Sequence, residues 1–322
     1  MLKNLTLSLK TDILKFIMRK SSHSLLDAIG NTPIAKVSFK TKAKVFAKLE
    51  YLNPGGSVKD RPALFMIEKA EKNGLLKSGG TIVEASSGNQ GIAIAMIGAI
   101  KGYKVIITVS EKISEEKIKT LKAYGAKVVI CPATNFIEDS RSYHSQAIAI
   151  HKRTPNSFMP NQYFNVLNPK AHYTTTGPEI WRQTKGKITH YFAAAGTSGT
   201  ISGIGKFLKK KNPKIKVIAV DVNTSFHATD GHPKSYKMEG IGIDFKTPCL
   251  DESVIDEFIS VSDKQGLGML KIMAKKYGFL VGTSAGAVSY AVQNYLPKLK
   301  KGDVAVMIFG DSGRAYLSKN YY

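Results

Sequence analysis

Residues 188–211 read ITHYFAAAGTSGTISGIGKFLKKK, and this stretch contains the pattern that decides the fold. An apolar run leads into a turn rich in glycine, serine and threonine. A helical pattern follows and ends in three lysines, where cations are favoured by the helix dipole. A run that is apolar throughout is typical of a parallel strand buried on both faces. The stretch therefore predicts a strand, a glycine turn and a helix in that order.

The same unit recurs in two series, at about residues 80–135 and 188–310. Helical patterns at 90–102 and 114–125 alternate with Val- and Ile-rich runs in the first series. This alternation predicts the α/β class, with two lobes and a ligand cleft between them at the carboxyl ends of the strands. The predicted strands are residues 44–50, 81–86, 103–110, 126–132, 188–195, 215–222 and 304–313.

Composition restricts the kind of protein. The chain has 322 residues, is 43% hydrophobic and has a formal net charge of +23. The hydrophobic fraction is sufficient for a sizeable core, and no apolar run reaches the length of a membrane span. The charge is spread along the whole chain, which favours attraction of small anionic substrates over nucleic-acid binding. Cys131 and Cys249 form no pair, which argues against zinc and disulfides and fits a reducing compartment.

Three polar loops each follow a strand-like run and open a helical pattern. Residues 193–205 offer converging backbone N–H groups, which suit phosphate, although a tight βα turn would need the same glycines. Residues 84–95 carry four polar side chains, more than helix capping needs, and suit a carboxylate. Residues 280–292 contain Ser284, either as an N-cap or as a hydroxyl that faces a ring nitrogen.

Lys59 lies in NPGGSVKDRPA, residues 53–63, where a turn leads into a helical pattern. A surface lysine without function is the common case. A lysine that faces a buried cleft at a helix N-terminus instead has its charged form disfavoured, so it can act as a neutral amine and form a Schiff base. Phosphate cradle, carboxylate loop and such a lysine are the anchors that a pyridoxal phosphate enzyme acting on an amino acid requires.

Several motifs in series resemble the cysteine synthase and cystathionine β-synthase family of fold-type II pyridoxal phosphate enzymes. They are NPGGSVKDR (53–61), SSGNQGIAIAMIGAIKGYK (86–104), NVLNPKAHYTTTGPEIW (165–181), GTSGT (196–200) and MEGIGIDF (238–245). The resemblance implies a two-lobed, three-layer α/β/α fold like that of the tryptophan synthase β-subunit, with pyridoxal 5'-phosphate between the lobes. It implies a basic extension at 1–22, a larger cofactor-anchoring lobe from 23–60 plus 167–322, and a smaller mobile substrate-carboxylate lobe at 61–166.

The resemblance also assigns the site, position by position. Lys59 would be the catalytic Schiff-base lysine, Asn89 would bind the ring hydroxyl of the cofactor and Ser284 would face its ring nitrogen. The phosphate would be held by Gly196, Thr197, Ser198, Gly199 and Thr200. The substrate would be bound by Ser86, Ser87, Gln90, Gln162, Gly240, Ile241 and Gly242.

The implied reaction is β-replacement on an activated serine such as O-acetylserine, through an aminoacrylate, with sulfide as acceptor and L-cysteine as product. One alternative is cystathionine formation from homocysteine and either serine or O-acetylserine. Another is a related reaction that uses an amine as nucleophile or cysteine as donor. Two departures bear on this choice: Gln90 stands where many relatives have threonine, and Ile243 replaces the tyrosine usual in cystathionine β-synthases. A non-catalytic regulator of the same fold would be colourless.

The resemblance further implies a cytoplasmic homodimer, with a serine acetyltransferase as a possible partner and no nucleic-acid or membrane partner. The seven histidines show no metal-ligand spacing, and no metal site is predicted.

Overall fold

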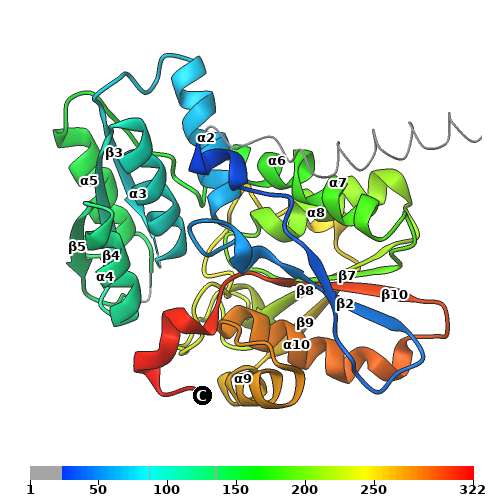
Figure 1. The fold of residues 1–322 in the computed structure, drawn as a ribbon. Coiled ribbons are helices and arrows are strands. Elements are labelled where there is room, and N and C mark those ends of the chain that lie inside the picture. The colour runs from blue at the N-terminus through cyan, green and yellow to red at the C-terminus, as the bar shows by residue number, and fades with distance from the viewer. Residues whose placement is uncertain (1–23, 87, 135) are drawn as a thin grey trace, which may run out of the picture.

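The computed structural model describes residues 24–86, 88–134 and 136–322. Two separate sheets with helices on their faces form two lobes, so the predicted α/β class and the two-lobed architecture are confirmed (Figure 1). The strands are β1 (Ile34–Lys36), β2 (Lys44–Leu49), β3 (Thr81–Ala85), β4 (Lys104–Ser110), β5 (Lys127–Cys131), β6 (Ser157–Phe158), β7 (His190–Ala194), β8 (Lys216–Val222), β9 (Glu257–Val261) and β10 (Val304–Phe309). The α-helices are α2 (Asp60–Lys72), α3 (Asn89–Lys101), α4 (Glu115–Ala123), α5 (Tyr143–Arg153), α6 (Leu167–Thr174), α7 (Thr176–Gln183), α8 (Gly199–Lys211), α9 (Asp263–Tyr277) and α10 (Thr283–Tyr295).

The larger sheet has the strand order β1-β2-β10-β7-β8-β9. All neighbours are parallel except β1, which pairs antiparallel with β2 at one edge. Successive residues of β7 point to opposite faces, so that Tyr191 packs in the layer with α8 and Phe192 packs in the layer with α9 and α10. This two-sided burial explains why the strands read as continuous apolar runs.

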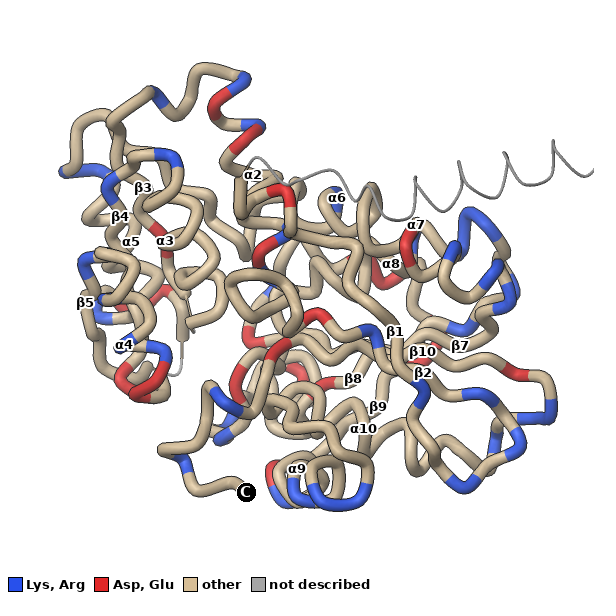
Figure 2. The backbone as a smooth tube through the Cα atoms, in the orientation of Figure 1, with Lys and Arg blue, Asp and Glu red and all other residues tan. Residues whose placement is uncertain are grey.

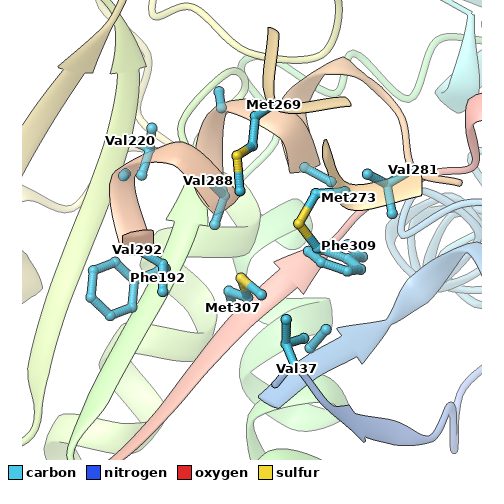
Figure 3. Close-up of a cluster of buried hydrophobic side chains, with 14 of the residues drawn as sticks. Val37, Phe192, Val220, Met269, Met273, Val281, Val288, Val292, Met307 and Phe309 are labelled. Atoms are coloured by element: carbon cyan, nitrogen blue, oxygen red, sulfur yellow. The ribbon is translucent and has the colours of Figure 1, made fainter. Parts of the chain in front are cut away.

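Residues at helical spacing fill the layer below the larger sheet. Met269 and Met273 of α9, and Val288 and Val292 of α10, are each four residues apart and fully or almost fully buried. Figure 3 shows them gathered with Met307 and Phe309 of β10. This packing fixes α10 against the sheet, and with it the position of Ser284 in the first turn of that helix.

The smaller sheet has the order β5-β4-β3-β6 and is parallel throughout. Side chains of α2, α3 and α4 pack on one face, while α5 packs on the other around Ala147. The smaller and larger sheets therefore each have their own core. The predicted lobe boundaries at 60/61 and 166/167 remain a proposal.

All seven predicted strands are present, within one to four residues of the predicted limits. Three strands were missed: β1, β6 and β9. β1 and β6 have only three and two residues, and β9 has a single buried residue, so none carries the apolar run from which the others were predicted. The polar end of residues 304–313 is also not strand, because β10 ends at Phe309.

Lysine and arginine residues lie over both lobes and do not form one stripe (Figure 2). No helix among the described residues is long and apolar enough to cross a membrane. In the same part of the chain, no group of three His, Cys, Asp or Glu side chains is placed to hold a metal ion.

Candidate active site

A cleft of about 450 Å³ receives residues from both lobes. Its lining includes Gln162 from the chain segment after β6 and Thr197 from the loop after β7. The structure also brings Lys59 to this cleft, 138 positions before Thr197 in the sequence. The predicted site residues that line it are Lys59, Gln162, Gly196, Thr197, Gly240, Ile241 and Gly242.

Lys59 occupies the N-cap position of α2 and lies in the wall of the cleft. Its Nζ donates a hydrogen bond to Thr197 Oγ1 at 3.3 Å. Desolvation in the cleft lowers the pKa of Lys59 to about 8, against weaker opposing effects of Cys249 and Asp311. With this pKa, roughly a tenth of the amine is neutral at pH 7, far more than for an ordinary lysine, and the neutral form is the nucleophile.

The loop after β7 surrounds the start of α8. Asn168 Nδ2 donates to Thr197 Oγ1 at 3.1 Å, while Asn168 Oδ1 is buried without a partner. A Cβ at position 199 would overlap Asn168 Oδ1, so only glycine fits there. Ser198 has φ +63°, a left-handed conformation that costs a serine roughly 1 kcal/mol. The fifth predicted residue, Thr200, contacts His172 Nε2 through its hydroxyl at 3.2 Å.

The loop after β3 serves capping and also leaves one polar side chain unpaired. Ser86 Oγ accepts hydrogen bonds from the N–H groups of Gly88 and Gly91, both at 2.9 Å. Gln90 is 1% exposed, and neither polar atom of its amide has a partner among the described residues. Ser87 lies outside the described residues. Capping of α3 therefore explains the hydroxyl of Ser86. It does not explain the polar side chain of Gln90.

Asn89 and Ser284 converge at the end of β10. Asn89 Nδ2 donates to Asp311 Oδ2 at 2.7 Å. Ser284 Oγ lies 3.6 Å from the place of a Cβ on Gly310, whose carbonyl accepts a hydrogen bond from Val58 N at 2.8 Å. Helix α10 begins at Thr283, so the N-cap interpretation of Ser284 is wrong and its hydroxyl is not used for capping.

The sequence did not point to Asp311 as a site residue. In the structure it is 2% exposed and accepts the hydrogen bond from Asn89. The available signal was the polar end of the run at 304–313, directly after a fully buried strand. Asn168 was missed as well. It lies within the quoted motif at 165–181, but its contact with Thr197 depends on the packing of α6 against α8.

Gln162 lines the cleft and is buried beside β3. Its Nε2 donates to the carbonyl of Ala85 at 3.1 Å, and its Oε1 has no partner in the described structure. The backbone N–H of Gln162 donates to Glu84 Oε2 at 3.3 Å. Burial raises the pKa of Glu84 to about 8 despite these backbone hydrogen bonds.

The residues present fit pyridoxal phosphate. The first N–H groups of α8 have no acceptor within their own helix and are therefore available to an anion. Because Gly199 has no side chain, Asn168 can pack directly against the start of this helix. A Cβ on Gly196 would lie 3.1 Å from the carbonyl oxygen of Gly240, which shows how closely the two loops approach. The loop after β7 would hold the phosphate, and Lys59, Asn89 and Ser284 would surround the ring.

The comparison with protein families agrees with this geometry. The pyridoxal-phosphate dependent enzyme family matches residues 25–311, which is most of the chain. The chain therefore belongs to this family, and the predicted cofactor class is confirmed.

Relatives of known name share the sequence over nearly the whole chain. A cystathionine β-synthase of Apis mellifera is 44% identical over 304 residues, covering 92% of this chain and 60% of the bee protein. A cysteine synthase of Staphylococcus aureus is 40% identical over 308 residues, covering 94% of this chain and 98% of that protein. The structure of an O-acetylserine dependent cystathionine β-synthase from Helicobacter pylori superposes with a TM-score of 0.86 at 36% identity, covering 94% and 99% of the two chains. The predicted enzyme class, a pyridoxal phosphate-dependent β-replacing synthase, is confirmed.

Proposed function

We propose that the chain forms L-cysteine from an activated serine, such as O-acetylserine, and sulfide. The observation that carries this proposal is the Lys59 amine, with a pKa of about 8, in a cleft that both lobes line. The match to a cysteine synthase over 98% of its length supports the choice.

Pyridoxal phosphate, when bound, supplies an aldehyde that reacts with amines and a conjugated ring that accepts an electron pair. Lys59, as a neutral amine, would take the proton from the Cα of the donor and return it to the same carbon of the product. The hydroxyl of Thr197 accepts a hydrogen bond from Nζ at 3.3 Å, and this contact would hold the amine in the wall of the cleft between the two proton transfers.

The wall formed by the loop after β3 and by Gln162 would receive the donor carboxylate. The amide of Gln90 has no hydrogen-bond partner among the described residues, so its N–H groups remain available to a ligand. Buried polar atoms of this kind are normally hydrogen-bonded. An amide N–H of Gln90 can donate to a carboxylate, and it reaches further than the threonine found in many relatives.

The pairing of acidic residues that line the cleft supports sulfide over a second amino acid as acceptor. Glu239 is paired with Lys117 at 2.8 Å, and Asp244 accepts from Tyr236 Oη at 2.7 Å. The ammonium group of homocysteine would have to compete for one of these carboxylates. Sulfide requires neither.

A second candidate acceptor is homocysteine, because the cleft extends well beyond Lys59. Tyr163 and Phe245 stack edge to face at 5.2 Å on one side of it. Its lining also contains lysines that could receive a second carboxylate, namely Lys112, Lys234, Lys237 and Lys319. Ile243 is 2% exposed and packs in the layer with α8, so the absence of the usual tyrosine removes a hydroxyl and leaves an apolar side chain in the core.

One assay tests both candidates. The cofactor-loaded protein is mixed separately with O-acetylserine, O-phosphoserine, serine and cysteine, followed by sulfide or homocysteine, and the product is identified by mass. Cysteine from sulfide supports the leading proposal, whereas a product with homocysteine alone overturns it in favour of cystathionine formation. Failure to take up pyridoxal phosphate in excess would contradict both.

The roles assigned to individual site residues are part of this proposal. So are the cytoplasmic location, which fits the two unpaired cysteines, and the homodimer and serine acetyltransferase partner, which rest on the family resemblance.

A further inference from the structure

Lys117 is a buried charge at the junction of the two lobes. It lies in α4 and is 1% exposed. Its Nζ donates to Glu239 Oε2 at 2.8 Å and to Tyr316 Oη at 2.9 Å, and it lies 4.2 Å from the centre of the Tyr316 ring. Glu239 belongs to the segment between β8 and β9, and Tyr316 to a 3-10 helix, Gly313–Lys319, that follows β10. One ammonium group thus joins α4 to two segments of the other lobe.

The stem of Lys117 supports the loop after β3. A Cβ on Gly88 would overlap Lys117 Cδ, and Gly88 has φ +125°, which favours glycine. Gly88 directly precedes Asn89 and Gln90. A change in the position of the Lys117 side chain therefore has to move the start of α3 or leave a gap beneath it.

The partner of Lys117 in the other lobe is itself fixed beside the cofactor site. The N–H of Glu239 donates to Thr283 Oγ1 at 2.9 Å, and the same hydroxyl donates to the carbonyl of Glu239 at 2.8 Å. Thr283 immediately precedes Ser284. Gly240, Ile241 and Gly242, which line the cleft, follow Glu239 directly.

A second route from Lys117 leads back to Asn89. Tyr316 donates to Asp311 Oδ2, the same oxygen that accepts from Asn89 Nδ2. Burial raises the pKa of Tyr316 well above its usual range, so its hydroxyl keeps the proton that it donates while it accepts from Lys117. The hydrogen bonds therefore connect Lys117, Tyr316, Asp311 and Asn89 in series.

The C-terminal segment reinforces this junction. Ser114 Oγ donates to the carbonyl of Ala315 at 2.6 Å, and the N–H of Ser318 donates to Glu116 Oε1 at 2.6 Å. In Figure 1 the segment, drawn in red, reaches from the end of β10 toward α4. Tyr316 is thus held against α4 from both sides along the chain.

We propose that Lys117 is a positioning residue for the donor amino acid: by holding Glu239 and Tyr316 while its stem supports Gly88, it sets the distance between the loop after β3 and the loop at 239–242. Lys117 is not among the residues that line the cleft. The inference rests on the proposed function in that these two loops are taken to bind the donor.

The test replaces Lys117 by methionine, which keeps the apolar stem and removes the ammonium. L-Alanine serves as the probe, because it has the amino and carboxylate groups of the donor but no β leaving group. We expect its Kd for the cofactor-loaded protein, measured by calorimetry and by the visible spectrum, to rise about tenfold, with the cofactor affinity changed by less than about threefold.

Amide hydrogen exchange in the cofactor-free protein gives a second readout. In Lys117→Met, peptides that contain residues 88–90 and 239–242 are expected to exchange about tenfold faster, while peptides from β7 and β8 do not change. Lys117→Arg should restore both readouts to within about threefold. Lys119→Met is the matched control, because Lys119 lies on the same helix with its side chain 72% exposed; it should change neither.

A Kd for L-alanine and loop exchange within about twofold of those of the unchanged protein would overturn the proposal. So would a uniform rise in exchange over the whole chain with no change in Kd, because that is the result of a purely structural role. If Lys117→Met does not fold, Glu239→Gln decides: it removes the ion pair at nearly constant volume and must weaken L-alanine binding in the same way. If the unchanged protein takes up no cofactor, the proposed function fails, and the exchange experiment still decides whether Lys117 couples the two loops.

Discussion

Lys48 and Lys59 lie eleven positions apart and differ in how their ammonium groups are used: Lys48 is fully buried, whereas Lys59 is partly buried in the wall of the cleft. Lys48 donates to the carbonyl of Thr32 at 2.5 Å, to Glu179 at 2.7 Å and to Gln183 at 3.1 Å, so all three of its protons have acceptors. Lys59 donates to Thr197 Oγ1 at 3.3 Å and has no further acceptor within the described part of the chain. Burial lowers the pKa of both lysines.

Burial alone therefore does not produce a nucleophilic lysine. Lys48 is part of a buried cluster in which Arg61 bridges Glu50 at 2.6 Å and Glu179 at 2.7 Å, and two cations face two carboxylates. Arg61 is only two residues after Lys59, so the first turn of α2 is fixed by this cluster while Lys59 remains available to the cleft. The cluster holds the helix, and the cleft lysine is the residue that we propose performs the chemistry.

The largest expected effect is that of Lys59→Ala. We expect turnover to fall by on the order of 10³-fold or more, because Lys59 is the group that we propose takes the Cα proton. The free energy of unfolding should change by less than about 1 kcal/mol, since Lys59 makes one long hydrogen bond. Turnover and urea unfolding measure the two quantities. Lys72→Ala, at the exposed end of the same helix, is the control, and undiminished turnover in Lys59→Ala would rule out the mechanism.

Lys48→Met should give the opposite pattern. Removal of one partner from a buried ion cluster is expected to lower the free energy of unfolding by about 3–5 kcal/mol. Turnover per folded molecule should stay within about threefold, because Lys48 does not reach the cleft. Denaturant unfolding and activity at low temperature test this, with Lys36→Met on the exposed edge strand as the control. A loss of activity without a loss of stability would remove the distinction between the two lysines.

The third prediction concerns pH. Only the neutral amine of Lys59 reacts with the aldehyde of the cofactor, so the rate of cofactor uptake by the cofactor-free protein should rise with pH and level off above about 8. Below that value it should fall about tenfold per pH unit as the ammonium form takes over. Stopped-flow absorbance measures the rate. A midpoint near 10.5, the ordinary value, would show that the cleft does not desolvate Lys59.

The smallest effect is expected from Ser87→Ala, which extends the comparison to the substrate end of the cleft. Loss of one hydroxyl from the proposed carboxylate loop should raise the Kd of the donor about tenfold and leave the cofactor affinity within about twofold. Titration with L-alanine tests this, and Ser145→Ala, on α5, is the control. Donor binding equal to that of the unchanged protein would show that the carboxylate lies elsewhere.

The seven predicted strands were readable because a strand covered on both faces is apolar at every position. The short β1 and β6 and the half-exposed β9 carry no such pattern. In the site, glycine turns and the lysine at a helix start were readable from local sequence. The contacts that complete it were not, since Asp311 lies 222 residues from Asn89 and Glu239 lies 122 residues from Lys117.

The sequence by itself determined the α/β class, the glycine turn that we propose binds phosphate and the place of Lys59 at a helix start, because each depends on residues that are neighbours in the chain. The tertiary structure alone decided that the ammonium group of Lys48 is saturated with acceptors and that the amine of Lys59 has one. It also decided that Lys117, Tyr316, Asp311 and Asn89 are joined. Hydrogen bonds act over about 3 Å, and only folding brings residues so distant in sequence to that separation.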